Sequence, residues 1–157
     1  MQILSRSVSH TQKIAKMMAS MFEAGDIICL FGDLGSGKTV FAAGVAAGLG
    51  IRKPNIVSPT FVLVKEYAGK EGIPFFHFDF YRLHSPEDIL FLGYEEYFYN
   101  RGITVIEWPE RLGYLLPEEF IKVNLSVAGP RERLISLCGK GKRYQKKMEL
   151  IYENLKP

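Results

Sequence analysis

Cysteine and long apolar runs are both scarce in this sequence, and each shortage excludes a class of protein. Two of the 157 residues are cysteine, Cys29 and Cys138, and each lies in or at the end of an apolar run. We expect both to be free and buried as small hydrophobic side chains. No apolar run approaches the roughly 18 residues that a membrane-spanning helix needs, and the N-terminus shows no cleavable signal pattern. A cytoplasmic protein is therefore expected.

The composition is that of an ordinary folded domain. Hydrophobic residues make up 47% of the chain, charged residues 24% and aromatic residues 13%. These proportions exclude the disordered and fibrous classes. A chain of 157 residues can bury a substantial core, but it is too short for a second full domain.

Positive charge is concentrated in one segment near the C-terminus. The net charge is +3, yet residues 139–147 (GKGKRYQKK) hold five basic residues and no acidic one. Without this segment, 15 basic residues face 17 acidic ones, a net charge of −2. Such a cluster suits phosphate groups or an acidic partner surface. The alternative is a solvated tail before a last helix.

The first third of the sequence alternates helix and strand patterns. Ser9, with Gln12 three residues later, has the pattern of a capping box that opens a helix, which we expect Gly25 to end. The apolar stripe of this helix is typical of core packing and consists of Ile14, Met17, Met18, Met21 and Phe22. Residues 26–31 (DIICLF) then predict a buried strand, and residues 38–50 a helix whose small residues allow close packing on a sheet.

The rest of the chain favours strands. Residues 58–67 and 73–83 are extended stretches joined by the short polar link 68–72, so they predict a hairpin and some antiparallel pairing. Residues 102–108 predict another buried strand. The closing elements are strands at 120–127 and 132–138 about a turn at 128–131, and a last helix at 144–155.

A helix is also indicated at residues 85–98, with Ser85 as its N-cap, Pro86 at the first helical position and Asp88 at the third. Together these elements predict a single α/β domain of three layers, in which helices flank a mixed, largely parallel central sheet. A nucleotide should then bind at the carboxyl ends of the strands.

The glycine-rich stretch between the first buried strand and the next helix carries the clearest chemical signal. Residues 32–39 spell G-x-x-x-x-G-K-T, the pattern of a phosphate-binding loop, in the strand–loop–helix context that this loop requires. The glycines let backbone N–H groups surround phosphate oxygens at a helix N-terminus. Lys38 is expected to reach the β- and γ-phosphates, and Thr39 offers a hydroxyl to Mg2+. A plain glycine-rich turn is disfavoured because loop, spacing and flanks agree.

Two acidic residues are placed to complete such a site. Asp79 and Glu107 each end a strongly apolar run, which is where an acid that binds the metal or its water usually lies. A capping role is the alternative for each. Thr60, which follows Pro59 about twenty residues after the loop, fits either a nucleotide-sensing segment or a proline turn.

The strand that contains Asp79 alternates polar and aromatic side chains. His77, Asp79 and Tyr81 share one face, and the phenylalanines between them are expected to face the core. A hydrogen-bonded structural role is favoured for His77 over proton transfer. Trp108, next to Glu107, is expected to be half-buried, with a cover over the site or a partner contact as alternatives.

Four segments occur in one order: GDLGSGKT (32–39), SPTFVLVKEY (58–67), HFDFYRL (77–83) and IEWPERL (106–112). In a chain of this length they closely resemble the TsaE family, also called YjeE, of bacterial P-loop ATPases. The likeness spans roughly residues 7–138. It implies an ATPase required to make threonylcarbamoyladenosine in tRNA, which works with the TsaB and TsaD proteins. TsaD transfers the threonylcarbamoyl group, so contact with tRNA would be indirect.

The resemblance also implies roles for individual residues. It makes Thr39 and Glu107 ligands of Mg2+, Thr60 a switch-like residue, and Lys38, Asp79 and Glu107 catalytic. The residues implied around ATP are Gly32, Asp33, Gly35, Ser36, Gly37, Lys38, Thr39, Val40, Thr60 and Arg133. The basic segment lies outside the shared motifs, so we expect an ATPase domain at 1–138 and a basic C-terminal extension with a helix at 139–157.

Val40 departs from the family pattern, because many members carry a second hydroxyl at this position. Two other functions fit the same loop. A small-molecule kinase would use Asp79 as the base for an acceptor hydroxyl, but no insertion resembles its arginine-bearing lid. A module that binds ATP without hydrolysis is the other alternative. The preference for ATP over GTP rests on the resemblance, although the chain has no N-K-x-D guanine motif.

Overall fold

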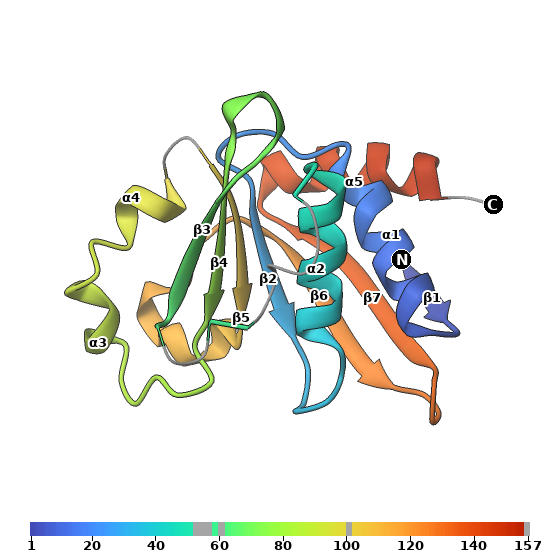
Figure 1. Cartoon of the computed structure of the whole chain (residues 1–157), viewed down its shortest axis with the longest axis horizontal. Helices are drawn as coiled ribbons and strands as arrows, with labels where there is room; N and C mark the ends of the chain where they lie inside the picture. Colours follow the sequence, from blue (N-terminus) through green and yellow to red (C-terminus); the bar gives the residue numbers. More distant parts are fainter. Residues whose placement is uncertain (52–57, 60–61, 100–101, 156–157) are drawn as a thin grey trace.

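The computed structural model describes residues 1–51, 58–59, 62–99 and 102–155. Over these residues, one sheet of seven strands in the order β1-β7-β6-β2-β5-β4-β3 has helices packed on it (Figure 1). The strands are β1 (Gln2–Ser5), β2 (Ile27–Phe31), β3 (Val64–Ala68), β4 (Pro74–Asp79), β5 (Ile103–Glu107), β6 (Phe120–Val127) and β7 (Arg133–Lys140). The helices are α1 (Val8–Ala19), α2 (Lys38–Gly48), α3 (Glu87–Leu90), α4 (Glu95–Phe98) and α5 (Lys142–Leu155), with short 3-10 helices η1 (Lys70–Gly72) and η2 (Pro109–Leu115).

The strand order confirms the predicted α/β fold with a mixed, largely parallel sheet. The four central strands β6, β2, β5 and β4 are parallel to one another. The outer strands are antiparallel to their neighbours: β7 to β6, β1 to β7, and β3 to β4. The carboxyl ends of β2, β5 and β4 therefore meet at one edge of the sheet, which is where parallel sheets place their ligand sites.

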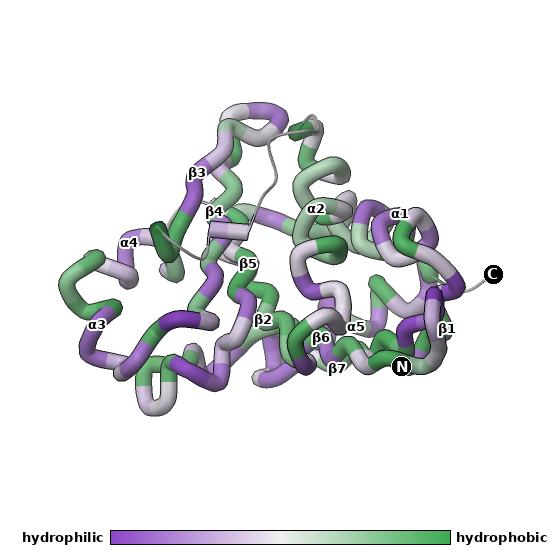
Figure 2. The backbone as a smooth tube through the Cα atoms, turned by 60° about the horizontal axis from the view of Figure 1, so that its bottom comes forward, coloured by the Kyte–Doolittle hydropathy of each residue, from purple (hydrophilic) through white to green (hydrophobic). Residues whose placement is uncertain are grey.

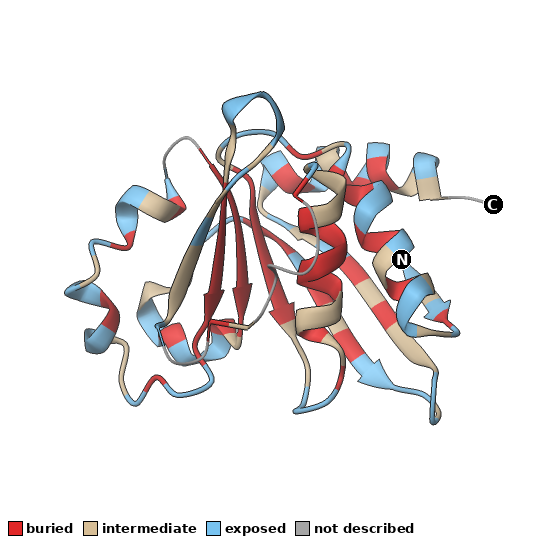
Figure 3. Ribbon diagram, viewed as in Figure 1, coloured by how far each residue is buried: buried red, intermediate tan, exposed pale blue. Residues whose placement is uncertain are grey.

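Strands β2 and β5 carry apolar residues on both faces because both of their faces are covered. Alternate residues of β2 enter two separate hydrophobic clusters: Ile28 and Leu30 join one, Ile27 and Cys29 the other. Hydrophobic residues gather along β2, β5 and α2 (Figure 2). Strand β5 is buried over its length, and β2 is buried up to its last residue, Phe31 (Figure 3). A continuous apolar run is what a strand between two helical layers requires.

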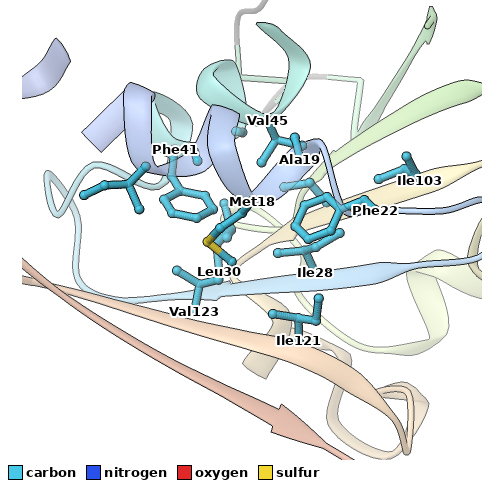
Figure 4. Close-up of a cluster of buried hydrophobic side chains, with 14 of the residues drawn as sticks. Met18, Ala19, Phe22, Ile28, Leu30, Phe41, Val45, Ile103, Ile121 and Val123 are labelled. Atoms are coloured by element: carbon cyan, nitrogen blue, oxygen red, sulfur yellow. The ribbon is translucent and has the colours of Figure 1, made fainter. Parts of the chain in front are cut away.

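The larger cluster lies between the sheet and helices α1, α2 and α5. Met18 of α1 and Phe41 of α2 are fully buried over Leu30 of β2 and Val123 of β6 (Figure 4). Burial of each such side chain contributes about 1.5–3 kcal/mol relative to exposure. The methionine stripe predicted as core packing therefore supplies part of this core through Met18.

Helix α5 belongs to the same packing. It buries Tyr144, Met148 and Ile151 in the larger cluster. Two of its basic residues bind an internal acid: Arg143 Nη2 lies 2.9 Å and Lys147 Nζ 2.5 Å from the carboxylate of Asp26, which is fully buried. The boundary at residue 138 stays a prediction, but part of the basic charge of residues 139–147 is neutralised within the chain.

Several predicted elements are confirmed. Strands β3 and β4 form the hairpin, with η1 in the link between them, and β3 begins at Val64. Strand β5 occupies the range predicted for a buried strand. The two closing strands and the last helix also form, as β6, β7 and α5.

The first helix begins and ends at residues other than those predicted. Its N-cap is Ser7, whose side chain accepts the N–H of His10 at 3.1 Å. Ser9 is already inside the helix, and its hydroxyl pairs with that of Ser7 at 3.0 Å. The helix ends at Ala19, well before Gly25. Ser7 takes the cap because its backbone is extended, as an N-cap requires.

The single helix predicted at 85–98 is wrong: two short helices, α3 and α4, occupy this range. Gly93 between them has φ of 60°, a left-handed conformation that interrupts a right-handed helix. Ser85 does not cap through its side chain. Instead the carboxylate of Asp88 accepts the backbone N–H of Ser85 at 3.1 Å and that of His84 at 3.2 Å.

The two cysteines differ in environment. Cys29 of β2 is fully buried, as predicted, and burial raises its pKa well above the ordinary value. Cys138 of β7 is free but exposed, so its predicted burial is wrong. It lies on the face of β7 opposite to Ile135 and Leu137, and only those two enter the larger cluster.

Candidate functional site

The loop between β2 and α2, which we call the glycine loop (residues 32–37), turns sharply at its first glycine. Gly32 has φ of 137°, and a Cβ at this position would lie 2.2 Å from the carbonyl oxygen of Leu125 in β6. A side chain would therefore be both strained and in collision with backbone. The glycine allows the loop to pass close to the sheet and to lead directly into α2.

Lys38, the first residue of α2, folds back over the glycine loop. Its Nζ donates to the carbonyl oxygens of Gly32 at 2.6 Å and Asp33 at 2.9 Å. The same atom lies 3.8 Å from the ring centroid of Trp108, a cation–π contact. Burial lowers the pKa of Lys38, and nearby carboxylates, chiefly that of Glu107, oppose this shift.

Glu107, the last residue of β5, joins two other elements through its carboxylate. Thr39 Oγ1 donates to Glu107 Oε2 at 3.0 Å. His77 Nε2, from β4, lies 2.8 Å from Glu107 Oε1, and both side chains are buried. The hydroxyl and the acid predicted to serve one metal ion therefore lie in direct contact.

Asp79 ends β4 beside Glu107, since the β4–β5 register pairs the two residues. Its Oδ1 accepts the backbone N–H of Tyr81 at 3.0 Å, and its Oδ2 accepts the hydroxyl of Ser58. Both acids predicted from the sequence therefore end neighbouring parallel strands. Thr60, the predicted switch-like residue, lies outside the described residues.

Strand β4 is buried on both faces. Phe76, Phe78 and Phe80 enter the smaller cluster, as expected. His77 on the other face is also fully buried, and its ring stacks on that of Phe75, with centroids 6.2 Å apart. The hydrogen-bonded role favoured for His77 is confirmed by its contact with Glu107.

Arg133, at the start of β7, holds the glycine loop from outside. Its Nε donates to the carbonyl oxygen of Ser36 at 3.0 Å, and its Nη2 to that of Gly35 at 3.1 Å. The hydroxyl of Ser36 is buried and has no hydrogen-bond partner among the described residues. Arg133 therefore fixes the loop backbone in this structure.

Among the described residues, two hollows lie against the start of α2. The first, of about 270 Å3, is lined by Leu34, Gly35, Gly37, Lys38, Thr39, Ser58, Asp79, Tyr81, Glu107 and Trp108. The second, of about 220 Å3, is lined by Ser7, Val8, Thr11, Val40, Pro130, Arg131 and Arg133. Lys38, Thr39, Asp79 and Glu107 thus share the first hollow, whereas Val40 and Arg133 line the second.

Ser58 contributes to the first hollow without having been predicted, and Trp108 takes the place over the site that was the alternative to simple half-burial. Ser58 binds Asp79, and nothing in its local sequence distinguishes it from any serine before a proline. Trp108 contacts Lys38 and also packs against Tyr81, with ring centroids 5.0 Å apart. Trp108 adjoins Glu107 in the sequence, which was the available signal, and it is half-buried as predicted.

The oxygen donors of the first hollow suit Mg2+ bound together with a phosphate. Within the described residues, no group of three or more His, Cys, Asp or Glu side chains gathers as a metal site. The chain instead offers the hydroxyl of Thr39 and the carboxylate of Glu107. Mg2+ commonly takes one or two protein oxygens and completes its shell with phosphate and water.

Comparisons with known proteins show which family this chain resembles. The family described as "Threonylcarbamoyl adenosine biosynthesis protein TsaE" matches residues 5–135. A relative named tRNA threonylcarbamoyladenosine biosynthesis protein TsaE, from Bacillus subtilis, is 40% identical over 136 residues, 86% of this chain and 83% of the relative. The protein of the same name from Treponema pallidum is 39% identical over 138 residues, 88% of this chain and 100% of the relative.

A solved structure shows the same fold. The crystal structure of Bacillus subtilis YdiB aligns with a TM-score of 0.83 at 34% identity, covering 98% of this chain and 94% of that one. Among the described residues, no helix is both long and apolar enough to cross a membrane.

Proposed function

The chain belongs to the TsaE family and takes part in the biosynthesis of threonylcarbamoyladenosine in tRNA; from this premise we propose that it binds and hydrolyses ATP with Mg2+. One observation carries the proposal: Lys38, Thr39 and Glu107 line the same hollow beside the glycine loop. A cation, a metal-binding hydroxyl and a carboxylate at a helix N-terminus form the recurring set for a nucleoside triphosphate.

The contacts of Lys38 are weak enough to be exchanged for contacts with an anion. Its present partners are two backbone carbonyl oxygens, which carry only partial negative charge. Phosphate oxygens of ATP are stronger acceptors for a buried ammonium group. We propose that Lys38 leaves these carbonyls for the β- and γ-phosphates, while backbone N–H groups of the glycine loop surround the phosphates.

We propose that the second hollow takes the nucleoside of ATP. It adjoins the first across Thr39 and Val40, successive residues of α2. With the γ-phosphate beside Glu107, the rest of the nucleotide would extend toward Val40, and the hollow offers the apolar Pro130 to the base. Val40 has no hydroxyl, so it would contact the nucleoside through its backbone and its methyl groups.

The roles of the acids follow from their neighbours. Glu107 and Thr39 would hold Mg2+, which would supply positive charge to the phosphates. Asp79 lies beside Glu107 at the end of the adjacent strand, where its carboxylate can orient the attacking water and accept a proton from it. Lys38 stabilises the charge on the transferred phosphoryl group.

The proposed partners are the TsaB and TsaD proteins, with ATP hydrolysis permitting repeated cycles of the complex. TsaE itself does not transfer the threonylcarbamoyl group, and its contact with tRNA is indirect. The family name places the chain in tRNA modification, which supports a partner-dependent ATPase over a free-standing kinase. The cytoplasm, which holds both tRNA and ATP, is the compartment that this role requires.

The test is Mg2+-dependent ATP hydrolysis with and without TsaB, TsaD and tRNA. Wild type is compared with Lys38→Ala, Glu107→Gln and the control Lys16→Ala, which alters an exposed lysine on α1. Glu107→Gln should lower turnover at least ~100-fold, about 2.7 kcal/mol of barrier, and leave much of the ATP binding. Absence of hydrolysis in every mixture would refute the ATPase and favour a module that only binds ATP.

A further inference from the structure

We propose that His77 is a positioning residue for Glu107, which it holds so that one carboxylate oxygen faces Thr39. This inference rests on the proposed function, because it assigns His77 a role through the Mg2+ ligand. The imidazole touches neither ATP nor the reacting atoms in this account. Its action is on the orientation of a neighbouring carboxylate.

The strand register brings the two side chains together. In the parallel pair β4–β5, His77 is opposite Val105 and Asp79 is opposite Glu107. His77 is therefore a diagonal neighbour of Glu107 on the same face of the sheet, within reach of a long side chain. The result is a contact of 2.8 Å between His77 Nε2 and Glu107 Oε1, with side-chain exposures of 0% and 3%.

Each oxygen of Glu107 has a different donor. Oε1 receives His77 Nε2 and Oε2 receives the hydroxyl of Thr39. The contact with Thr39 is the one that a metal ion between the two side chains would replace. The contact with His77 lies on the other oxygen, within the sheet, and can persist when metal binds. His77 therefore determines which oxygen Glu107 presents to the site.

The surroundings of the ring indicate which nitrogen carries the proton. His77 Nδ1 is buried and has no hydrogen-bond partner among the described residues. A proton on Nε2 satisfies the carboxylate of Glu107, and a bare Nδ1 leaves only a neutral acceptor unpaired. A donor on Nε2 is therefore what holds the carboxylate of Glu107.

A carboxylate that binds metal loses affinity when its outer hydrogen bond is removed, typically by 10–100-fold. In this chain, removal of the imidazole would leave Glu107 Oε1 buried without its donor and free the carboxylate to rotate. Binding of the nucleotide without metal depends on Lys38 and the glycine loop instead. The effect of His77 should therefore fall on the metal and spare the metal-free nucleotide.

The experiment measures two affinities by calorimetry: that of ADP in EDTA, and that of Mn2+ for the ADP complex. It compares wild type, His77→Ala, His77→Gln and the control Thr104→Ala. Thr104 is buried on β5 and donates to the carbonyl oxygen of Tyr97, so its loss removes a buried hydrogen bond away from Glu107. We expect His77→Ala to weaken Mn2+ binding at least ~10-fold and ADP binding less than ~2-fold. His77→Gln, whose amide N–H can donate, should recover most of the metal affinity.

Other results separate this inference from the proposed function. If wild type binds neither ADP nor Mn2+, the proposed function fails and the inference with it. If wild type binds both, but His77→Ala loses no more Mn2+ affinity than Thr104→Ala, only the inference is overturned. Should His77→Ala not fold, His77→Leu replaces it as the variant without a donor. Equal Mn2+ affinity of the Leu and Gln variants would then overturn the inference.

Discussion

Replacement of Asp26 tests whether α5 is an integral part of the fold. Asp26 is fully buried just before β2, and its carboxylate binds Lys147 at 2.5 Å and Arg143 at 2.9 Å, both on α5. It also accepts the backbone N–H of Glu23 at 2.8 Å. Removal of one partner of a buried ion pair typically costs about 3–5 kcal/mol, because the other charge is left unpaired. We expect Asp26→Ala to lower the free energy of unfolding by about 3 kcal/mol, the lower end, because Arg143 is half-exposed.

The chain provides a matched control on the same lysine. Glu23 also binds Lys147, at 3.2 Å, but its side chain is 76% exposed. Exposed ion pairs contribute about 0–1 kcal/mol. Glu23→Ala should therefore lower the free energy of unfolding by less than about 1 kcal/mol. Asp26→Asn keeps an oxygen for the N–H of Glu23 and removes only the charge, and it should therefore fall between the two.

Urea unfolding followed by far-ultraviolet circular dichroism measures all three variants. The loss of unfolding free energy should be largest for Asp26→Ala, smaller for Asp26→Asn and smallest for Glu23→Ala. Equal losses for Asp26→Ala and Glu23→Ala would refute this order, since they would show that burial of the ion pair has no energetic consequence and that α5 is not held through Asp26.

Three further predictions concern the loop and the core. Trp108 is the only tryptophan of the chain, and its ring contacts Lys38. ATP binding should therefore change its fluorescence, and Lys38→Ala should remove that change. An unchanged emission spectrum at saturating ATP would contradict the contact. Gly32→Ala should weaken ADP binding at least ~10-fold, about 1.4 kcal/mol, as measured by calorimetry. The reason is that the added Cβ would collide with the carbonyl oxygen of Leu125. Wild-type affinity of the variant would refute the close approach of the glycine loop to β6. Burial raises the pKa of Tyr144 to about 12, above its unfolded value near 10, so stability is fully present below pH 10 and falls as pH rises toward 12. Unfolding curves of wild type and Tyr144→Phe at several pH values should show a smaller decline in this range for the variant.

The local sequence was sufficient wherever the structure follows from neighbours along the chain. The glycine loop is one case, because a continuous apolar run, a fixed glycine spacing and a helix of small residues all lie within about twenty positions. The ends of β4 and β5 are another, since Asp79 and Glu107 each follow an uninterrupted buried stretch. Periodicity and turn residues carry this information directly.

The local sequence was insufficient where the structure depends on the backbone conformation of one residue, or on which face of a strand is covered by other elements. Gly93 takes a left-handed conformation and divides the helix predicted at 85–98, although the flanking residues favour one continuous helix. Cys138 follows an apolar run but lies on the face of β7 that the larger cluster does not cover. Ser7 and Ser9 are equally good caps by residue type, and only the extended backbone of Ser7 distinguishes them.

The sequence by itself determined the α/β class, the glycine loop and the two acids, because each depends on short-range pattern. The tertiary structure alone decided which side chains meet. His77 reaches Glu107 because β4 lies beside β5, Lys38 reaches Trp108 because β2 lies on the other side of β5, and Lys147 reaches Asp26 because α5 packs on the larger cluster. Strand order and helix packing arise from contacts between distant segments, and no local pattern of residues specifies them.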